Sequence, residues 1–209
     1  MLTYIIFSVL VLSTYIFNLI FLMPEFSFWY ITVAMLLSII IEIAIGGFCA
    51  TVVCKLLPDK WFSHKIKLYN VSKKEYNFYI NFLKIKVWKD KVLDLGKLNG
   101  FQKKSMEDSS SSEYLKKFII ECNCGFVEHV FSIIIGCFVI FLYPKALVWS
   151  MGLPTILINF IINYMSITIL RFNIPRLKTA LKFAERQEER KNINKTNINN
   201  NEDEIKSTN

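Results

Sequence analysis

The chain has 209 residues, a formal net charge of +8, and a composition that is 53% hydrophobic and 15% aromatic. This apolar share exceeds the roughly 45–50% of soluble domains, which excludes an ordinary water-soluble protein. The positive charges gather beside apolar segments without any nucleic-acid-binding motif, so we expect membrane lipids as partners and no nucleic acid.

Two apolar segments of membrane length occupy the first part of the chain. Residues 2–23 have no preceding positive charge and no small-residue cleavage site after them, which predicts an uncleaved span. Residues 26–57 predict a second span, so residues 1–57 should form a two-helix membrane hairpin. Glu42 lies near the middle of the second span, where it either bonds to another helix or lines a substrate cavity. The sequence leaves both interpretations open.

A basic region rich in Lys, Trp, Tyr and Phe follows at residues 58–117. We expect it to lie along the membrane surface. Residues 74–87 mix Lys with aromatic and aliphatic side chains at spacings that predict one amphipathic interfacial helix. The serine run within residues 107–113 indicates a flexible loop.

The remaining apolar segments, residues 126–143 and 146–170, predict the third and fourth spans. Pro175 predicts that the fourth helix kinks or ends near Asn173, because proline removes a backbone hydrogen bond and crowds the preceding turn. We place a second membrane hairpin, with the candidate site, at residues 118–176. The chain is therefore predicted to be all-α and polytopic, with about four transmembrane helices and an interfacial region between the second and third.

The end of the chain, residues 177–209, is polar. Residues 177–191 indicate an exposed charged helix, and the Asn-rich residues 192–209 contain too few hydrophobic side chains to order themselves. Four spans and the distribution of Lys and Arg predict a multi-pass protein of the cell membrane with both termini in the cytoplasm.

The five cysteines lie in or beside apolar segments, so we expect reduced, buried side chains. The two histidines are far apart and no Cys–His cluster exists, which predicts no metal, and no sequence pattern indicates a cofactor. The cysteines are Cys49, Cys54, Cys122, Cys124 and Cys137.

Glu121, Glu128 and His129 predict a catalytic group if the third span is helical. The glutamates are seven residues apart and share one face, and His129 is about 100° further round. A carboxylate that orients an imidazole suits a general base. Alternatively, Glu121 is an interface residue and His129 a hydrogen-bonded polar residue between helices, which spacing alone favours.

Four short blocks together resemble the glycosyl-4,4'-diaponeurosporenoate acyltransferase family, over roughly residues 57–190. The blocks are Pro58-Asp59-Lys60-Trp61-Phe62, Trp88-Lys89-Asp90-Lys91 with Leu93-Asp94, Ile119-Ile120-Glu121 with His129, and Arg171-Phe172-Asn173-Ile174-Pro175-Arg176-Leu177. Members are small bacterial membrane proteins whose named activity esterifies a fatty acyl group onto the glucose of a C30 carotenoid glucoside. The resemblance implies an acyltransferase, a glycosylated isoprenoid acceptor, an acyl thioester as co-substrate and no cofactor.

The resemblance also implies site residues. His129 would be the catalytic base, oriented by Glu121 or Glu128. Arg171 and Arg176 would hold the phosphates of the donor or the developing oxyanion, although arginines at such a boundary also anchor a helix to the cytoplasmic face. The full substrate-binding set is Asn163, Arg171, Asn173, Arg176, Asp59, Trp88 and Asp94.

Two departures from the family pattern stand out. Phe126 occupies the position of a glutamate that usually lies three residues before the histidine, and Glu128 directly precedes His129 instead. The first span is also extra relative to shorter members. Other readings keep the chemistry with a different glycolipid acceptor, or make the chain a non-catalytic membrane partner of a larger enzyme or transporter.

Overall fold

A computed structural model describes residues 2–22, 25–92 and 111–207, and nearly all of them are helical. No strand occurs within these ranges. Asp94 and most of the predicted serine loop lie outside the described residues.

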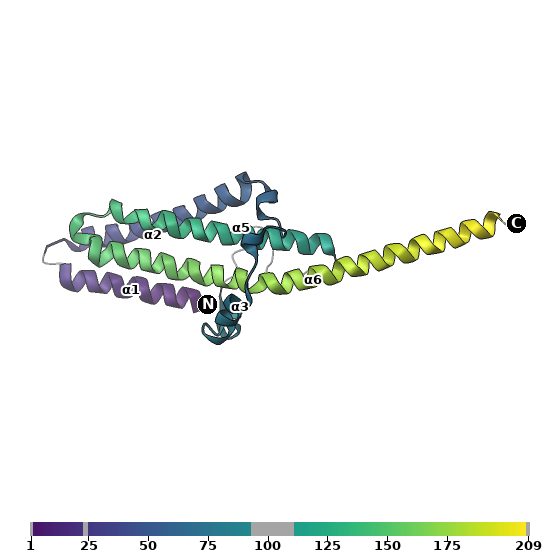
Figure 1. Cartoon of the computed structure of the whole chain (residues 1–209). Coiled ribbons are helices and arrows are strands. Elements are labelled where there is room, and N and C mark those ends of the chain that lie inside the picture. The colour runs from purple at the N-terminus through teal and green to yellow at the C-terminus, as the bar shows by residue number, and fades with distance from the viewer. Residues whose placement is uncertain (1, 23–24, 93–110, 208–209) are drawn as a thin grey trace.

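Four helices are long and apolar enough to cross a membrane. They are α1 (Leu2–Leu22), α2 (Phe28–Thr51), α5 (Ser112–Cys137) and α6 (Leu153–Ser207). The turn between α1 and α2 and the turn between α5 and α6 lie at one end of the bundle, and the N-terminus and the protruding half of α6 lie toward the other (Figure 1). The predicted all-α polytopic fold with four spans is confirmed.

Helices α1 and α2 turn large apolar side chains outward. Ile20 is 65% exposed and Ile43 is 70% exposed. Such surfaces are unfavourable in water and match the hydrocarbon of a bilayer, where a helix also satisfies its own backbone hydrogen bonds. A few polar contacts hold these helices to the rest, since Nδ2 of Asn18 donates to the backbone oxygen of Ser150 at 2.9 Å.

The central packing lies between the antiparallel helices α5 and α6. Leu115 and Ile119 on α5 are fully buried, and they pack in one cluster with Leu170, Ile174 and Leu181 on α6. These positions recur at intervals of four and seven residues, which places them on one stripe of each helix. The stripe sets which side of α6 faces α5, and so which polar side chains can meet.

The chain from α5 to α6 turns through short irregular helices. Phe138–Leu142 (η6) and Lys145–Leu147 (η7) are 3-10 turns, and Val148–Gly152 (η8) is a π-helical turn. Pro154 then lies in the first turn of α6, a position where proline is tolerated.

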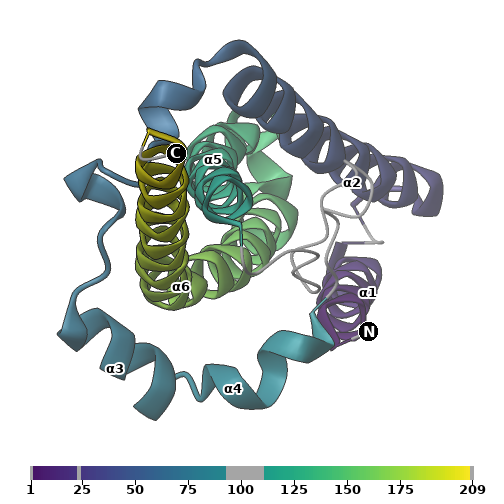
Figure 2. The ribbon, with the colours of Figure 1, turned by 90° about the vertical axis from the view of Figure 1, so that its right-hand side faces the viewer.

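Residues 58–92, which we call the arm, leave the end of α2 and curve around α6 (Figure 2). A π-helical turn, Val52–Leu56 (η1), leads into it. The arm contains the 3-10 turns Asp59–Phe62 (η2), Lys67–Tyr69 (η3) and Lys89–Lys91 (η4), and the short helices α3 (Lys73–Asn81) and α4 (Ile85–Trp88).

The prediction of one helix over residues 74–87 is wrong, because the chain breaks between α3 and α4. Lys84 has a φ of 48°, the left-handed conformation that few residues other than glycine adopt. The indole Nε1 of Trp88 donates to the backbone oxygen of Leu83 at 2.8 Å. This side-chain bond satisfies a carbonyl that the interrupted helix leaves without its backbone donor.

Of the two predicted effects of Pro175, a kink or an end of the fourth helix near Asn173, the end is wrong. Helix α6 continues through Pro175 to Ser207, and it changes direction part-way along its length (Figure 1). Packing against α5 on both sides of the proline maintains the helix, since Leu170 and Leu177 are both buried in the same cluster. A proline then bends a helix rather than ending it.

Beyond the proline, the structure differs from the prediction of an exposed helix and a disordered tail. Leu181 and Ala184 are buried against α5, because α5 begins at Ser112, earlier than the predicted hairpin. The backbone is helical through the predicted tail as far as Ser207. Extending a formed helix is far easier than nucleating one, so a polar segment can continue α6 without burying apolar surface.

The prediction that all five cysteines are reduced and buried is wrong for three of them. Cys54, within η1, and Cys124, on α5, form a disulfide, and Cys137 is exposed. Cys49 and Cys122 are buried thiols as predicted. Seventy residues separate Cys54 from Cys124 in sequence, so only the packing of α2 against α5 brings them together.

Candidate active site

His129 on α5 faces α6 and shares a hydrogen bond with Asn163. Its Nδ1 atom lies 2.8 Å from Oδ1 of Asn163. At 100° per residue, Asn163 falls on the same side of α6 as Leu170 and Ile174, which pack against α5. The structure thus joins the histidine predicted to be catalytic to one of the asparagines predicted to bind substrate.

A second hydrogen bond of Asn163 fixes which of its atoms faces the imidazole. Its Nδ2 donates to the backbone oxygen of Asn159 at 3.0 Å. A carbonyl can only accept, so the amide nitrogen points to Asn159 and Oδ1 points to His129. An acceptor opposite Nδ1 requires the ring proton on Nδ1 and places the lone pair on Nε2. The arrangement prepares Nε2 to take a proton, as a general base must.

The contacts continue from α6 to α2. Nδ2 of Asn163 lies 3.3 Å from Oδ1 of Asn159, and Nδ2 of Asn159 donates to Oε2 of Glu42. His129, Asn163, Asn159 and Glu42 therefore form one connected series across three membrane helices, which we call the polar chain. Of the two interpretations left open for Glu42, the structure shows a hydrogen bond to another helix.

A glycine on α5 makes room for the polar chain. A Cβ atom added at Gly136 would lie 2.7 Å from Nδ2 and 2.9 Å from Cγ of Asn159. Separations under 3.0 Å essentially never occur for real Cβ atoms, so any other residue would displace the Asn159 side chain. Gly136 therefore allows α5 to approach the amide of Asn159 closely.

We expect Gly136→Ala to lower acyl transfer about tenfold, because displacing Asn159 breaks a hydrogen bond to a carboxyl, and about 1.4 kcal/mol corresponds to tenfold in rate. The matched control is Gly46→Ala on α2, where an added Cβ meets nothing within 4 Å. Rates of product formation by the two purified variants give the comparison. Equal rates for Gly136→Ala and the wild type would remove the polar chain from catalysis.

The two glutamates predicted to orient His129 share one face of α5, as their spacing indicates. That face turns toward the end of α2, where Oε2 of Glu128 lies 3.9 Å from Sγ of Cys54. Glu121, which lies seven residues before Glu128 and so nearer the start of α5, is partly buried. The partner found at Nδ1 of His129 is the amide of Asn163, so a catalytic role for either glutamate stays a prediction.

Arg171 is engaged by the arm. Its guanidinium forms a bidentate pair with Glu75 on α3, in which Nη2 lies 2.9 Å from Oε2, and Nη2 also donates to the backbone oxygen of Asn70 at 3.2 Å. The hydroxyl of Tyr79 donates to the same carboxylate. The guanidinium carbon lies 4.9 Å from the ring centre of Phe126.

This pairing changes the expected role of Arg171. A guanidinium already matched by a carboxylate has little net charge left for the phosphates of a donor. Burial raises the pKa of the Glu75 carboxyl, but hydrogen bonds from Arg171 and Tyr79 outweigh it, and the pKa lies below its usual value. Burial and the Glu75 carboxylate together raise the pKa of Tyr79. The cluster therefore fastens the arm to α6.

We expect Glu75→Gln to release the arm from α6 at neutral pH, because Arg171 loses its opposite charge. In the wild type the depressed pKa of Glu75 means that its contribution is fully present above the ordinary glutamate pKa of 4.5 and is lost as the pH falls through the lower folded-state pKa. Limited proteolysis at neutral and acid pH measures arm release, with the exposed Glu189→Gln as control. An arm equally resistant in Glu75→Gln and wild type contradicts this role.

Two predicted substrate-binding residues of the arm lie apart from the polar chain. Asp59 is exposed at the start of η2, and Trp88 is partly buried with its indole bonded to the carbonyl of Leu83. Asp94 lies outside the described residues. The observed contacts of Trp88 are those of a residue that shapes the arm.

The last two predicted residues lie on α6. Arg176 is exposed, about 220° around the helix from Asn163, and so points away from α5. Asn173 is partly buried and about 80° from Asn163. The structure does not bring either one to His129, so substrate binding by these residues stays a prediction.

Three residues of these contacts were not predicted from the sequence. Asn159 lies four residues before Asn163, a spacing that puts both amides on one helix face. Gly136 faces that amide from the third span. Glu75 follows Ser72 by three residues, and its backbone N–H donates to the Ser72 hydroxyl at 3.1 Å, the pattern of a helix-capping box. The partnership of Glu75 with Arg171, 96 residues away, leaves no local signal.

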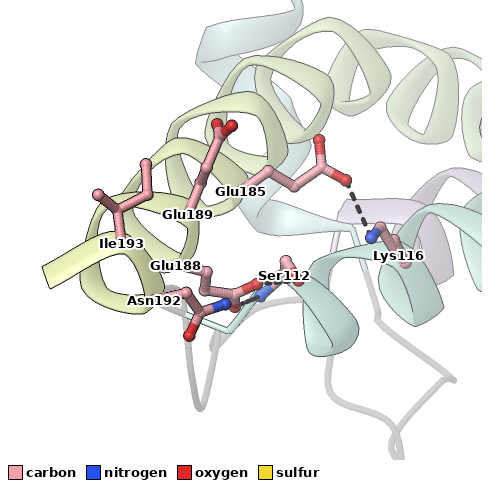
Figure 3. Close-up of a pocket in the computed structure, with 7 residues that line it drawn as sticks. All are labelled: Ser112, Lys116, Glu185, Glu188, Glu189, Asn192 and Ile193. Carbon is pink, nitrogen blue, oxygen red and sulfur yellow. Dashed lines mark hydrogen bonds and ion pairs between the residues drawn. The ribbon is translucent and has the colours of Figure 1, made fainter. Parts of the chain in front are cut away.

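An open pocket of about 680 Å³ lies elsewhere, between the start of α5 and the protruding half of α6 (Figure 3). Glu188 accepts hydrogen bonds there from the backbone nitrogen and the hydroxyl of Ser112, at 2.9 and 2.6 Å. Lys116 and Glu185 form an ion pair at 2.9 Å. One of these contacts satisfies a backbone donor at the start of α5, and together the residues lining the pocket join the two helices.

The sequence model of one family, described as glycosyl-4,4'-diaponeurosporenoate acyltransferase, matches residues 58–183, well over half of the chain. No curated protein and no solved structure gives a significant match. The matched region contains His129, Asn163 and Asn159, whereas Glu42 and the whole first hairpin lie before it.

Proposed function

The chain belongs to the glycosyl-4,4'-diaponeurosporenoate acyltransferase family and is an acyltransferase, and we propose that it esterifies a fatty acyl group onto a sugar hydroxyl of a glycosylated carotenoid. The acyl donor is a thioester. The observation that carries the proposal is the hydrogen bond between Nδ1 of His129 and Oδ1 of Asn163, which sets the imidazole as a base.

In the proposed reaction, Nε2 of His129 takes the proton from the sugar hydroxyl as its oxygen attacks the thioester carbonyl. The carbon–sulfur bond breaks, and the imidazolium returns the proton to the leaving thiolate. The products are an ester and a thiol, so no oxidant, reductant or metal enters the balance. Proton transfer by a positioned side chain contributes about 10²–10⁴-fold in rate.

The depth of the polar chain supports a lipid acceptor. At 1.5 Å per residue, Asn163 lies about 15 Å along α6 from its start, near the middle of a hydrocarbon core about 30 Å thick. Arg171 lies about 12 Å further along, toward the basic end. A carotenoid glucoside, whose apolar part is already in the bilayer, reaches such a site more readily than a water-soluble sugar does.

We also propose that the end of the bundle carrying the arm faces the cytoplasm of the cell. The Lys-rich arm and the charged half of α6 gather there (Figure 1), as the positive-inside rule favours. The Cys54–Cys124 disulfide favours the opposite orientation, because disulfides are rare in the cytosol. Labelling Lys residues of the arm in intact cells with a membrane-impermeant reagent separates the two: protection supports the cytoplasmic placement.

The test of the function uses the purified full-length chain in lipid vesicles, with a long-chain acyl thioester and a glucosylated C30 carotenoid. We expect an ester whose mass equals that of acceptor plus acyl group, together with release of free thiol. The aglycone carotenoid and an unrelated glycolipid serve as comparison acceptors. A chain that makes no ester alone, but does so with an added membrane protein, would instead be a non-catalytic partner.

A further inference from the structure

Glu42 belongs to the first hairpin, outside the matched residues, yet its carboxyl reaches the candidate site. We infer that Glu42 is a positioning residue for the proposed transfer: acting through Asn159 and Asn163, it holds His129 in the tautomer whose Nε2 accepts a proton, and it offsets the charge that the imidazole then gains. The inference rests on the proposed function and extends its site to a third helix.

The hydrogen bonds of the polar chain all run in one direction. The ring N–H of His129 donates to Asn163, the amide of Asn163 donates to Asn159, and the amide of Asn159 donates to Glu42. Hydrogen bonds aligned in this way polarise one another, and the effect is largest where little water is present. A negative charge at the Glu42 end therefore favours positive charge at the His129 end.

The contact between α2 and α6 does not require a carboxyl group at position 42. Its Oε2 accepts the bond from Asn159, whereas its Oε1 is buried and has no hydrogen-bond partner among the described residues. A carboxylate at mid-membrane costs about 2.5–3.5 kcal/mol on insertion scales, and a neutral amide would make the same bond to Asn159 more cheaply. An expensive group at this position calls for a use of its charge.

The other ionisable groups near His129 are arranged differently. Arg171 is paired with Glu75 and lies over Phe126, one turn of α5 away from His129. Glu121 and Glu128 occupy a face of α5 about 100° from the imidazole. Hydrogen bonds through Asn163 and Asn159 connect Nδ1 of His129 to the Glu42 carboxyl. The ionisable groups on the helices around His129 are Glu42 on α2, Glu121 and Glu128 on α5, and Tyr164 and Arg171 on α6.

The test replaces Glu42 by Gln, whose amide oxygen can still accept from Asn159 while the charge is lost. We expect kcat to fall at least about tenfold with KM unchanged, less than the ~10⁴-fold seen when a carboxylate bonded directly to a catalytic histidine is replaced. Asn159→Ala breaks the chain from the other side, leaving Glu42 in place. The double variant should be no slower than the slower single variant, because both remove one pathway.

A spectroscopic measurement separates positioning from general stability. In ¹⁵N-histidine-labelled protein, the nitrogen shifts report which ring nitrogen carries the proton, and His64→Gln removes the other histidine. We expect mainly Nδ1–H in the parent and a mixture of tautomers in Glu42→Gln. Ser38→Ala is the matched control, since Ser38 also bonds α2 to the α5–α6 turn, through Tyr143, but is outside the polar chain.

The outcomes are distinct. If the parent chain makes no ester, the proposed function fails, and the tautomer measurement still decides whether Glu42 acts on His129. If the parent is active and Glu42→Gln matches it in kcat and tautomer, Glu42 is a structural contact only and the inference is overturned. Should Glu42→Gln insert poorly, Asn159→Ala provides the same comparison. A Ser38→Ala variant that shifts the tautomer equally would also overturn it.

Discussion

Replacing His129 by Ala is expected to lower kcat by about 10²–10⁴-fold, the usual contribution of a positioned general base. The variant lacks the nitrogen that takes the hydroxyl proton, while α5 keeps its apolar stripe and so its packing against α6. The measurement is ester formation by purified protein in vesicles, with the amount of inserted protein determined in parallel.

The natural control is His64→Gln, because His64 is the only other histidine and lies in the arm, away from the polar chain. Burial and the neighbouring Lys65 lower the pKa of His64, so it is mostly neutral at pH 7 and the substitution changes little charge. We expect activity close to that of the wild type. A His129→Ala variant as active as His64→Gln would remove His129 from the mechanism.

Replacing Asn163 by Leu has the second largest expected effect. The substitution leaves the Nδ1–H of His129 without its acceptor, and an unsatisfied buried donor costs about 1–3 kcal/mol, equivalent to roughly ten- to hundred-fold in rate. The ring is then free to adopt the other tautomer, with its lone pair turned away from the substrate. Steady-state kinetics should show the loss in kcat, with KM little changed.

Asn173→Leu is the matched comparison, since the family resemblance places both asparagines in the predicted substrate-binding set. Asn173 lies on a different face of α6 and is not part of the polar chain. We expect a much smaller loss of kcat than for Asn163→Leu. A larger loss for Asn173→Leu would show that these amides act by binding the sugar and not by orienting His129.

The membrane architecture is readable from the sequence because hydrophobic length is a local property. Each span requires about 20 apolar residues, and the four segments are found where that rule places them. The end of α6 is not local in this sense: Pro175 signals a break, but packing against a partner of unknown length decides whether the helix continues. The early start of α5 at Ser112 provides that partner.

The candidate site was predictable in its chemistry and less so in its connections. His129 and Asn163 could be identified from polarity within apolar spans and from the family resemblance. Their direct bond, and the extension to Glu42, depend on the register of α5 against α6 and of α6 against α2. One-residue shifts of that register would turn each side chain by about 100°, so no short-range pattern determines it.

The role of the arginines at the end of the fourth span could not be determined from local sequence either. Polar residues at the end of a span are equally expected of a substrate clamp and of an interfacial anchor. Glu75 and Asn70 from the arm bind the guanidinium of Arg171 in the structure, and a role of Arg171 in substrate binding stays a prediction. Docking of the arm on α6 therefore places protein at the proposed cytoplasmic boundary, about 12 Å along α6 from Asn163.

The most direct test of the account is the protonation state of the His129 ring in the intact protein. Nitrogen NMR of ¹⁵N-histidine-labelled full-length chain in lipid vesicles, in the His64→Gln background, reads the two ring nitrogens separately. The account predicts the proton on Nδ1 and an unprotonated Nε2 at neutral pH. A proton found on Nε2 would mean that Asn163 does not hold the imidazole as described, and the proposed base would have no lone pair where the reaction needs it.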